Sequence, residues 1–476
     1  IGFVDNSKLK KVSVDGGSVL VLGNSRGIYG GGTWTSRGEI IVSNETSRLY
    51  AVPENGGPAR RVCRDIPANV LSEVEPETTP DADTFLFSAG VTSDVAANRL
   101  GVGSLSTGKC VVLEIPTVQP LGIIDGLLVY ATVSGAIMAV PFDLKARKVK
   151  GSAVPVLTDV DVNQTTGAMQ ASMSPTGSLM YLSGSAAGQL VSVDMHGAST
   201  PIMEDSKGFA YPRYSPDGRR IAVAIATSGQ RDIWLVDVRN KTTTRFTSAN
   251  FNDRPEWTPD GKRLLYRSAR SARSEIVWRA VDMSDEETPL LANPAVDFYE
   301  GVITPDGQHI IYQLDTIGAD VWYRRLAGDP TSKAIASTQF VEDMARPSPN
   351  GRWVAYVSAE SGRDEVFVKP FARPGPQVQV SVGGGDEPVW SPDGTRLYYR
   401  NEENFMSASI RAGDELEVIS RDVLFRDSFM KRSLPHANYD VARDGKSLLM
   451  VKSTEEPEVT VIYNWITELR SKLARK

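Results

Sequence analysis

One short pattern recurs along the chain and restricts its fold more than any other feature. It consists of Ser or Thr, then Pro, then Asp or Asn, then Gly, and a β-rich run follows each copy. Proline fixes φ at about −65°, Asp bonds to its own backbone, and Gly adopts the positive φ that a tight turn needs. The pattern therefore predicts a turn between two strands. Its glycines, counting one weaker copy, are residues 177, 218, 261, 307, 351 and 394.

The runs after these turns predict strands, and each repeat has room for four of them. The strand directly after the turn is expected at residues 220–226, 263–267, 309–313, 353–357 and 396–400. Four antiparallel strands in about 43 residues form one blade of a β-propeller. The 41 glycines and 28 prolines interrupt every repeat, which excludes helical repeats. One helix is expected from about Trp465, because Trp465, Leu469 and Leu473 recur at helical spacing.

Ten turns can be counted when the weaker copies of the pattern are included. Residues 1–22 add a first blade that lacks one strand. The predicted fold class is therefore all-β, a β-propeller of ten to eleven four-stranded blades with a short C-terminal helix. Because one ring usually holds about four to eight blades, two propellers are expected. Residues 1–165 hold divergent blades and residues 166–476 hold the regular blades and the helix, so we place a domain boundary between them. The two termini could also share one ring.

Composition narrows the classes of function. The chain has 52 basic and 58 acidic residues and a net charge of −6, so no nucleic-acid partner is expected. It has no run of about 18 apolar residues, so no membrane span is expected. Cys63 and Cys110 are expected to be two buried thiols, although one disulfide between them stays open. The three histidines lie far apart in the sequence, which disfavours a His-built metal site.

Candidate site residues come from the strand before each turn, because this strand lines the central channel of a propeller. The positions three and five residues before the turn proline are polar and of mixed charge. Equivalent positions from successive blades should form layers around the channel, and convergent polar groups at a concave place indicate binding. We predict that the ligand-binding residues at the channel mouth are Glu75, Tyr211, Arg213, Arg254, Glu256, Glu300, Arg346, Glu387 and Asn438.

These layers have two interpretations. In the first, neighbouring Arg and Glu side chains pair across blades and water fills the channel. In the second, the mouth binds a small polar ligand or a peptide. A divalent cation such as calcium could also be held by carboxylate oxygens of Glu75, Glu300 and Glu387. Apart from that cation, no cofactor is expected.

Motifs for catalysis do not support an enzyme. The chain has no Gly-rich loop ahead of a VAIK-type Lys, no HRD and no DFG, so kinase chemistry is not encoded. Zinc-hydrolase HExxH pairs are also missing. The single GxSxG string, Gly23–Gly27, runs into more glycines rather than a helix, so we interpret it as a loop and not as a nucleophile elbow. We assign no catalytic residue.

The Ser-Pro-Asp-Gly turns resemble the TolB-like, WD40-like PD40 repeats of bacteria. A closer resemblance, to the C-terminal half of certain bacterial transmembrane serine/threonine kinases, is carried by the segments Lys8–Gly17, Arg48–Gly57, Gly135–Pro155 and Val459–Leu469. In that family a cytoplasmic kinase domain and one membrane span precede an extracytoplasmic propeller region, and about one and a half further blades precede the equivalent of Ile1. The chain starts with Ile and shows no signal-peptide pattern, so we read it as a piece of a longer protein.

The resemblance implies an extracytoplasmic or periplasmic sensor or interaction module. We therefore expect a non-enzymatic module that binds a protein, a peptide or a small polar ligand at a propeller face or channel mouth. One alternative is a hydrolase or lyase that acts at the channel mouth through Glu and Arg side chains, with or without a cation. Another is a TolB-like periplasmic scaffold.

Overall fold

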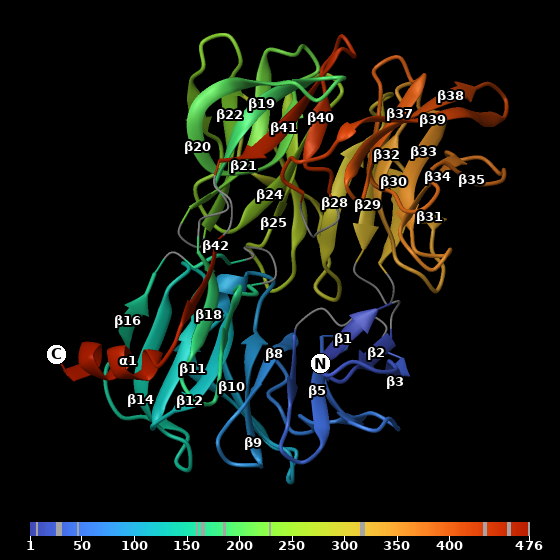
Figure 1. Cartoon of the computed structure of the whole chain (residues 1–476). Coiled ribbons are helices and arrows are strands. Elements are labelled where there is room, and N and C mark those ends of the chain that lie inside the picture. The colour runs from blue at the N-terminus through green and yellow to red at the C-terminus, as the bar shows by residue number, and fades with distance from the viewer. Residues whose placement is uncertain are drawn as a thin grey trace. The chain divides into compact units, whose positions relative to one another are not determined.

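A computed structural model describes the chain except for residues 6–7, 25–30, 45–46, 159, 163–166, 184–186, 228–229, 315–318, 432–435, 455–457 and 475–476. The chain is nearly all β, with many four-stranded antiparallel sheets and one C-terminal helix, α1 (Trp465–Ala474) (Figure 1). This confirms the predicted fold class. The residues form two compact units. Unit 1 holds residues 1–185, 227–229 and 456–476, and unit 2 holds residues 186–226 and 230–455.

Four blades of unit 2 are sheets of four strands that follow one another in the chain. Their strands are β24 (Asn252–Trp257), β25 (Arg263–Ser268), β26 (Glu275–Ala280) and β27 (Thr288–Leu291); β28 (Phe298–Ile303), β29 (His309–Leu314), β30 (Asp320–Arg325) and β31 (Lys333–Ala336); β32 (Glu342–Pro347), β33 (Trp353–Ser358), β34 (Glu365–Pro370) and β35 (Val378–Gln379); and β36 (Asp386–Trp390), β37 (Arg396–Asn401), β38 (Asn404–Ala412) and β39 (Leu416–Arg426).

Two further blades of unit 2 are joined in one seven-stranded sheet. The long strand β20 pairs with β19 through its first half and with β21 through its second half, so it belongs to both blades. Because β41 pairs with β19, the two ends of the unit build one blade together. The strands, in sheet order, are β40 (Tyr439–Val441), β41 (Ser447–Ser453), β19 (Gly188–Asp194), β20 (Ser199–Tyr214), β21 (Arg220–Thr227), β22 (Gln230–Asp237) and β23 (Thr243–Arg245).

The six blades of unit 2 close into a ring. The first strand of each blade contacts the first strand of the next, in the order β20, β24, β28, β32, β36 and β40, and β40 contacts β20 again. Buried apolar clusters span neighbouring blades: one includes Tyr211 of β20 and Trp257 of β24, and another includes Trp353 of β33 and Trp390 of β36. The six inner strands are thus held side by side around one axis.

Unit 1 consists of five sheets, and its last sheet takes β42 from the far end of the chain. Trp465 and Leu469 of α1 are buried against Leu179 and the sheet before it. The strands are β1 (Gly2–Asp5), β2 (Lys8–Lys11) and β3 (Leu20–Asn24); β4 (Gly32–Trp34), β5 (Glu39–Ser43), β6 (Leu49–Pro53) and β7 (Arg60–Arg61); β8 (Ser72–Thr78), β9 (Thr84–Gly90), β10 (Arg99–Ser104) and β11 (Cys110–Pro116); β12 (Gln119–Ile124), β13 (Leu127–Ala131), β14 (Ile137–Asp143), β15 (Lys148–Val149) and β16 (Val154–Leu157); and β17 (Ala171–Met173), β18 (Leu179–Ser183) and β42 (Glu458–Ile462), with a short 3₁₀ helix at Val95–Ala97.

The predicted turns are present, with the expected local hydrogen bonds. Asp217 Oδ1 accepts from Ser215 Oγ at 2.6 Å and from the Arg219 backbone N–H at 3.0 Å, while Gly218 has φ 73°. The same contacts recur at Thr258 and Asp260, at Thr304 and Asp306, and at Ser391 and Asp393. These aspartates therefore form turns, and the five strands predicted after the turns are each one residue longer than expected. The Gly23–Gly27 string lies largely in residues 25–30, outside the described part.

One prediction about the cysteines is wrong. Cys63 and Cys110 form a disulfide, with their Cα atoms 5.4 Å apart. The separation of 47 residues gives no signal for this pairing, because the two segments come together only when the strands of the folded sheet are in place. Asp65 forms a parallel bridge with Lys109, and the backbone N–H of Cys110 donates to the Asp65 carbonyl at 2.9 Å. The disulfide therefore ties the loop after β7 to the start of β11.

Candidate functional site

The inner strands of unit 2 bring most of the predicted site residues together. Eight of the nine lie on these strands or directly before them, and all eight side chains are buried rather than open at a channel mouth. The ninth, Glu75, lies on β8 of unit 1. The centre of the unit 2 ring therefore holds this set: Tyr211, Arg213, Arg254, Glu256, Glu300, Arg346, Glu387 and Asn438.

A repeated β-bulge shapes these inner strands. Tyr211, Arg254, Met344 and Glu387 all have positive φ, between 51° and 56°, and the pairing register of each strand shifts at that point. Such left-handed backbone is unfavourable for residues with a side chain, and a bulge bends the strand and redirects its side chains. In these four strands the position five residues before the turn proline is therefore a bulge and not part of a regular strand.

A chain of ion pairs crosses the centre of the ring. Arg213 Nε lies 2.8 Å from Glu256 Oε1, and Arg346 Nη2 lies 3.0 Å from the same oxygen. Arg346 also reaches Glu300 Oε1 through Nη1 at 2.8 Å. These four side chains come from β20, β24, β28 and β32, so each carboxylate is shared between blades. Arg and Glu therefore pair across blades, as the first interpretation of the layers predicts.

His436 stands beside these pairs and was not among the predicted site residues. Its Nδ1 lies 3.0 Å from Glu300 Oε1 and its Nε2 lies 3.4 Å from Glu256 Oε1, while its ring meets Tyr211 edge to face at 5.1 Å. Burial, followed by the charges of Arg213 and Arg346, holds the pKa of His436 well below its usual value. Its place two residues before Asn438 is the one signal in the sequence that could have indicated it.

Glu256, Glu300 and His436 are also spaced as three metal ligands could be, since their ligand atoms lie within 4.8 Å of one another. The donor set does not fit a cation. Glu256 Oε1 is in ion pairs with Arg213 and Arg346, and Glu300 Oε1 is in one with Arg346. A further guanidinium, that of Arg254, adds positive charge that lowers the pKa of His436. Arg346 thus occupies the place that a cation would need.

The three carboxylates expected to hold calcium are divided between the two units. Glu75 belongs to unit 1, whereas Glu300 and Glu387 belong to unit 2. Glu387 serves the ring instead: its Oε2 accepts from the Asn438 backbone N–H at 2.6 Å and lies 3.2 Å from Arg400 Nε. Asn438 Oδ1 in turn accepts from the Tyr211 backbone N–H at 2.8 Å, which ties the residue directly before β40 to β20.

Arg254 is held in place while part of its guanidinium is left without a partner. Its Nη1 donates to the Tyr299 carbonyl at 2.9 Å, and its guanidinium lies over the rings of Tyr211 and Tyr299 at 5.8 and 5.6 Å. Its Nε and Nη2 have no hydrogen-bond partner in the described structure. Next to it, burial would raise the pKa of Asp253, but Arg267 and Arg254 hold that pKa at about 2.

Two aspartates that the sequence analysis missed lie near the start of neighbouring inner strands. Asp343 on β32 and Asp386 on β36 each have a buried Oδ1 without a hydrogen-bond partner in the described part. Burial, then the charge of Glu387, raises the pKa of Asp386 to about 7. Burial, then the charge of Asp364, raises the pKa of Asp343 well above its usual value. Each directly precedes a bulge residue. The sequence analysis would have found both by also reading the position six residues before the turn proline.

Glu75 occupies the equivalent bulge in unit 1, with φ 51°. A side chain at Gly31 would place its Cβ 2.6 Å from Glu75 Oε2, so this carboxyl needs the glycine beside it. Burial raises the pKa of Glu75 to about 7. On the same strand, Glu77 Oε1 accepts from Thr33 Oγ1 at 3.4 Å.

Comparisons with known proteins agree with this fold. Among curated proteins, an uncharacterized protein of Agrobacterium fabrum (strain C58) is 28% identical over 249 residues, which is 48% of this chain and 82% of that protein. No helix in the described residues is long and apolar enough to span a bilayer.

Solved structures with a similar chain path include a proposed TolB from Agrobacterium tumefaciens, with 14% identity, TM-score 0.45 and coverage of 57% of this chain and 100% of that one. TolB from Acinetobacter baumannii has 15% identity, TM-score 0.41 and coverage of 70% and 79%. An oligogalacturonate lyase from Vibrio parahaemolyticus has 10% identity, TM-score 0.38 and coverage of 61% and 95%. No function is drawn from these likenesses.

The family model of the PD40 TolB β-propeller domain matches residues 162–369. This range covers β17 to β33 and most of β34, and so includes four of the six inner strands of unit 2. It holds the turns at Ser215, Thr258, Thr304 and Ser348 whose hydrogen bonds repeat from blade to blade. Residues 162–369, a little less than half of the chain, thus resemble a TolB-like PD40 β-propeller domain.

Proposed function

We propose that this chain is a non-enzymatic binding module of an extracytoplasmic or periplasmic compartment, which takes a peptide, a protein segment or a small polar ligand at the centre of the unit 2 ring. The observation that carries the proposal is a set of buried polar atoms without partners in the described part: Arg254 Nε and Nη2, Glu300 Oε2, Asp343 Oδ1 and Asp386 Oδ1.

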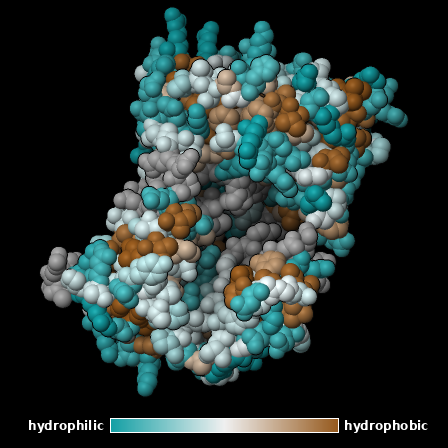
Figure 2. All heavy atoms as spheres, in the orientation of Figure 1, coloured by the Kyte–Doolittle hydropathy of each residue, from teal (hydrophilic) through white to brown (hydrophobic). Residues whose placement is uncertain are grey.

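Buried polar atoms are almost always hydrogen-bonded, so a group of them around one axis calls for a ligand or ordered water. The set contains guanidinium donors and carboxyl oxygens together. A ligand that offers both an acceptor and a donor, as a peptide or a zwitterionic small molecule does, would satisfy it. On the outer face drawn in Figure 2, apolar side chains form separate groups among hydrophilic ones.

The ion pairs argue against catalysis by the acidic residues. Glu256 forms ion pairs with Arg213 and Arg346, and Glu300 forms one with Arg346 and contacts His436, so both carboxylates already have partners inside the ring. The disulfide between Cys63 and Cys110 supports the extracytoplasmic location, because structural disulfides persist mainly in oxidising compartments.

Binding can be tested by calorimetry on the purified chain with tripeptides and zwitterionic amino acids. Arg254→Gln and Asp386→Asn should each weaken binding about tenfold, as expected for loss of one charge-assisted hydrogen bond. Arg352→Gln is the matched control, because Arg352 pairs with Asp414 at the surface. Equal binding by all variants would contradict the proposal. Turnover of an ester, lactone or glycan substrate that Glu256→Gln abolishes would replace it with the hydrolase or lyase alternative.

A further inference from the structure

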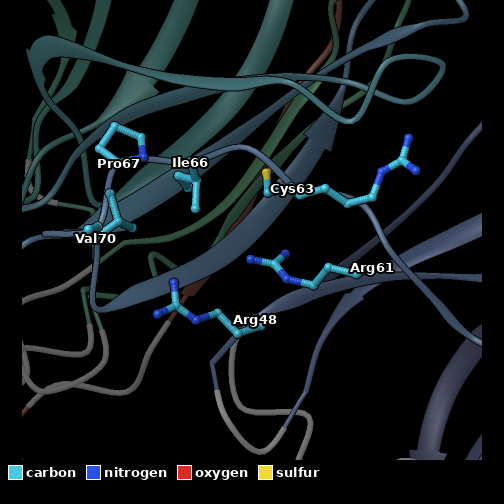
Figure 3. Close-up of a pocket in the computed structure, with 8 residues that line it drawn as sticks. Arg48, Arg61, Cys63, Ile66, Pro67 and Val70 are labelled. Carbon is cyan, nitrogen blue, oxygen red and sulfur yellow. The ribbon is translucent and has the colours of Figure 1, made fainter.

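A second pocket lies in unit 1, and none of its lining residues belongs to the inner strands of unit 2. It is a pocket of about 380 Å³, within the range of small-molecule sites, and it lies beside the disulfide. Arg48, Arg61 and Arg64 line it together with Cys63, Ile66 and Val70. In Figure 3, Arg48 and Arg61 both extend their guanidinium groups toward the left of the view, and Ile66, Pro67 and Val70 lie above and to the left of them.

The positive charge of this pocket is only partly balanced. Arg48 Nη1 lies 3.0 Å from Glu73 Oε1, and Arg61 holds both oxygens of the same carboxylate, with Nη1 at 2.6 Å from Oε2. Glu73 is fully buried behind them. Arg64 donates from Nη2 to the Thr107 carbonyl at 3.3 Å, which is a neutral partner. Two guanidinium groups therefore share one carboxylate, the third binds a neutral carbonyl, and the described residues that line the pocket include no acid.

Glu73 also fixes the geometry of the two inner arginines. Its Oε2 accepts from the Leu49 backbone N–H at 3.2 Å, and Arg61 Nη1 donates to the Leu49 carbonyl at 3.0 Å. Arg61 further lies over the ring of Tyr50 at 5.9 Å. Arginines held in this way lose little freedom on binding, and their planar groups suit the paired oxygens of a carboxylate or phosphate.

The other wall of the pocket is apolar and is fixed by a covalent link. Ile66, Pro67 and Val70 follow Cys63, which is joined to Cys110 of β11. The backbone N–H of Val70 donates to the Pro67 carbonyl at 3.0 Å, which turns this loop over the pocket. A guanidinium wall that faces an apolar wall is suited to a ligand with an anionic head and an apolar body.

We propose that this pocket binds a small amphipathic oxyanion, a carboxylate or a phosphate monoester with an apolar chain or ring. The anionic group lies against Arg48, Arg61 and Arg64, and the apolar body packs on Ile66, Pro67 and Val70. This site is separate from the ring centre of unit 2 and does not depend on the function proposed for it.

Calorimetry with octanoate, octyl phosphate, inorganic phosphate and octanol tests the proposal on the whole chain at constant ionic strength. Octanoate or octyl phosphate should bind, and whichever binds more tightly identifies the head group. Inorganic phosphate and octanol should each bind at least tenfold more weakly, because each lacks one half of the ligand. Equal affinity for octyl phosphate and inorganic phosphate, or no binding of either amphipathic probe, would overturn it.

Variants separate a binding role from a folding role. Arg64→Gln should weaken octanoate or octyl phosphate about tenfold, and it leaves the Glu73 ion pairs intact. Ile66→Glu places a carboxylate on the apolar wall and should abolish binding by repulsion. Arg99→Gln is the matched control, because Arg99 pairs with Glu114 elsewhere in the same unit. Unchanged affinity in both Arg64→Gln and Ile66→Glu, with melting temperatures equal to that of the unaltered chain, would contradict the assignment of the pocket.

Discussion

Arg346 and Glu300 form a buried ion pair between neighbouring inner strands, with Nη1 2.8 Å from Oε1. The same guanidinium lies 3.0 Å from Glu256 Oε1, so one arginine joins β32 to both β28 and β24. Removing it would leave Glu300 buried without its paired cation and would leave Glu256 with Arg213 alone. We predict that Arg346→Met lowers the free energy of unfolding by about 3–5 kcal/mol, the usual cost of breaking a buried pair. Urea denaturation measures this change.

A surface pair provides the comparison for Arg346. Arg352 lies 3.1 Å from Asp414, and both side chains are exposed. Arg352→Met should change the free energy of unfolding by less than about 1 kcal/mol. Similar losses in the two variants would show that the central pairs contribute no more than surface pairs do, and that the inner strands are held by their apolar contacts alone.

The turns could be predicted from the sequence because their hydrogen bonds are local. The hydrogen bonds of Ser215 and Asp217 and the positive φ of Gly218 all lie within six residues, so these residue types alone determine the turn. The disulfide could not be predicted in this way. Cys63 and Cys110 meet because Asp65 pairs with Lys109, and such pairing depends on the order of strands in space and not on any local signal.

The sequence could predict which residues lie on the inner strands, but not which of their side chains contact one another. Counting back from the turn proline selected residues on the inner strands, since every blade repeats the same spacing. The bulges at Arg254 and Glu387 then decide which side chains meet, and nothing in the residue types marks a bulge there. His436 was missed because it reaches Glu256 and Glu300 only after the end of the unit returns to complete the ring.

Asp386 should make the stability of unit 2 depend on pH. Burial, then the charge of Glu387, raises its pKa from 3.8 to about 7 in the folded chain. Between these values the folded state binds a proton that the unfolded state has released, so the contribution of this group to stability falls as pH rises from 4 to 7. Asp386→Asn removes this dependence. At pH 8 the variant should be more stable than the unaltered chain, by at most about 4 kcal/mol.

The measurement is the free energy of unfolding at pH 4.5 and pH 8, taken from urea titrations. The two proteins should differ little at the lower pH, where Asp386 is protonated in the folded state. Asp414→Asn, at an exposed position, should leave the pH dependence unchanged. A constant difference between Asp386→Asn and the unaltered chain at both pH values would contradict the raised pKa.

Reduction of the disulfide should destabilise unit 1 selectively. Cys63 and Cys110 are separated by 47 residues, and closing a loop of that length restricts the unfolded chain by about 4 kcal/mol. The double variant Cys63→Ala, Cys110→Ala should therefore show faster hydrogen exchange in β4 to β11. Peptides from β24 to β39 of unit 2 serve as the internal control and should exchange as before. Equal acceleration in both units would indicate that the link does not act locally.

Trp465 should be the main contact through which α1 stabilises unit 1. Its side chain is 1% exposed and packs with Leu179 and Leu469 against the sheet of β12 to β16. Trp465→Ala removes this buried ring and should cost about 3–5 kcal/mol. Tyr463→Ala is the matched control, since Tyr463 is 78% exposed two residues earlier and its loss should cost less than about 0.5 kcal/mol. Hydrogen exchange of β17, β18 and β42 provides the local measurement. Unchanged protection of these strands in Trp465→Ala would mean that the pairing of β42 with β18 holds the end of the chain without the helix.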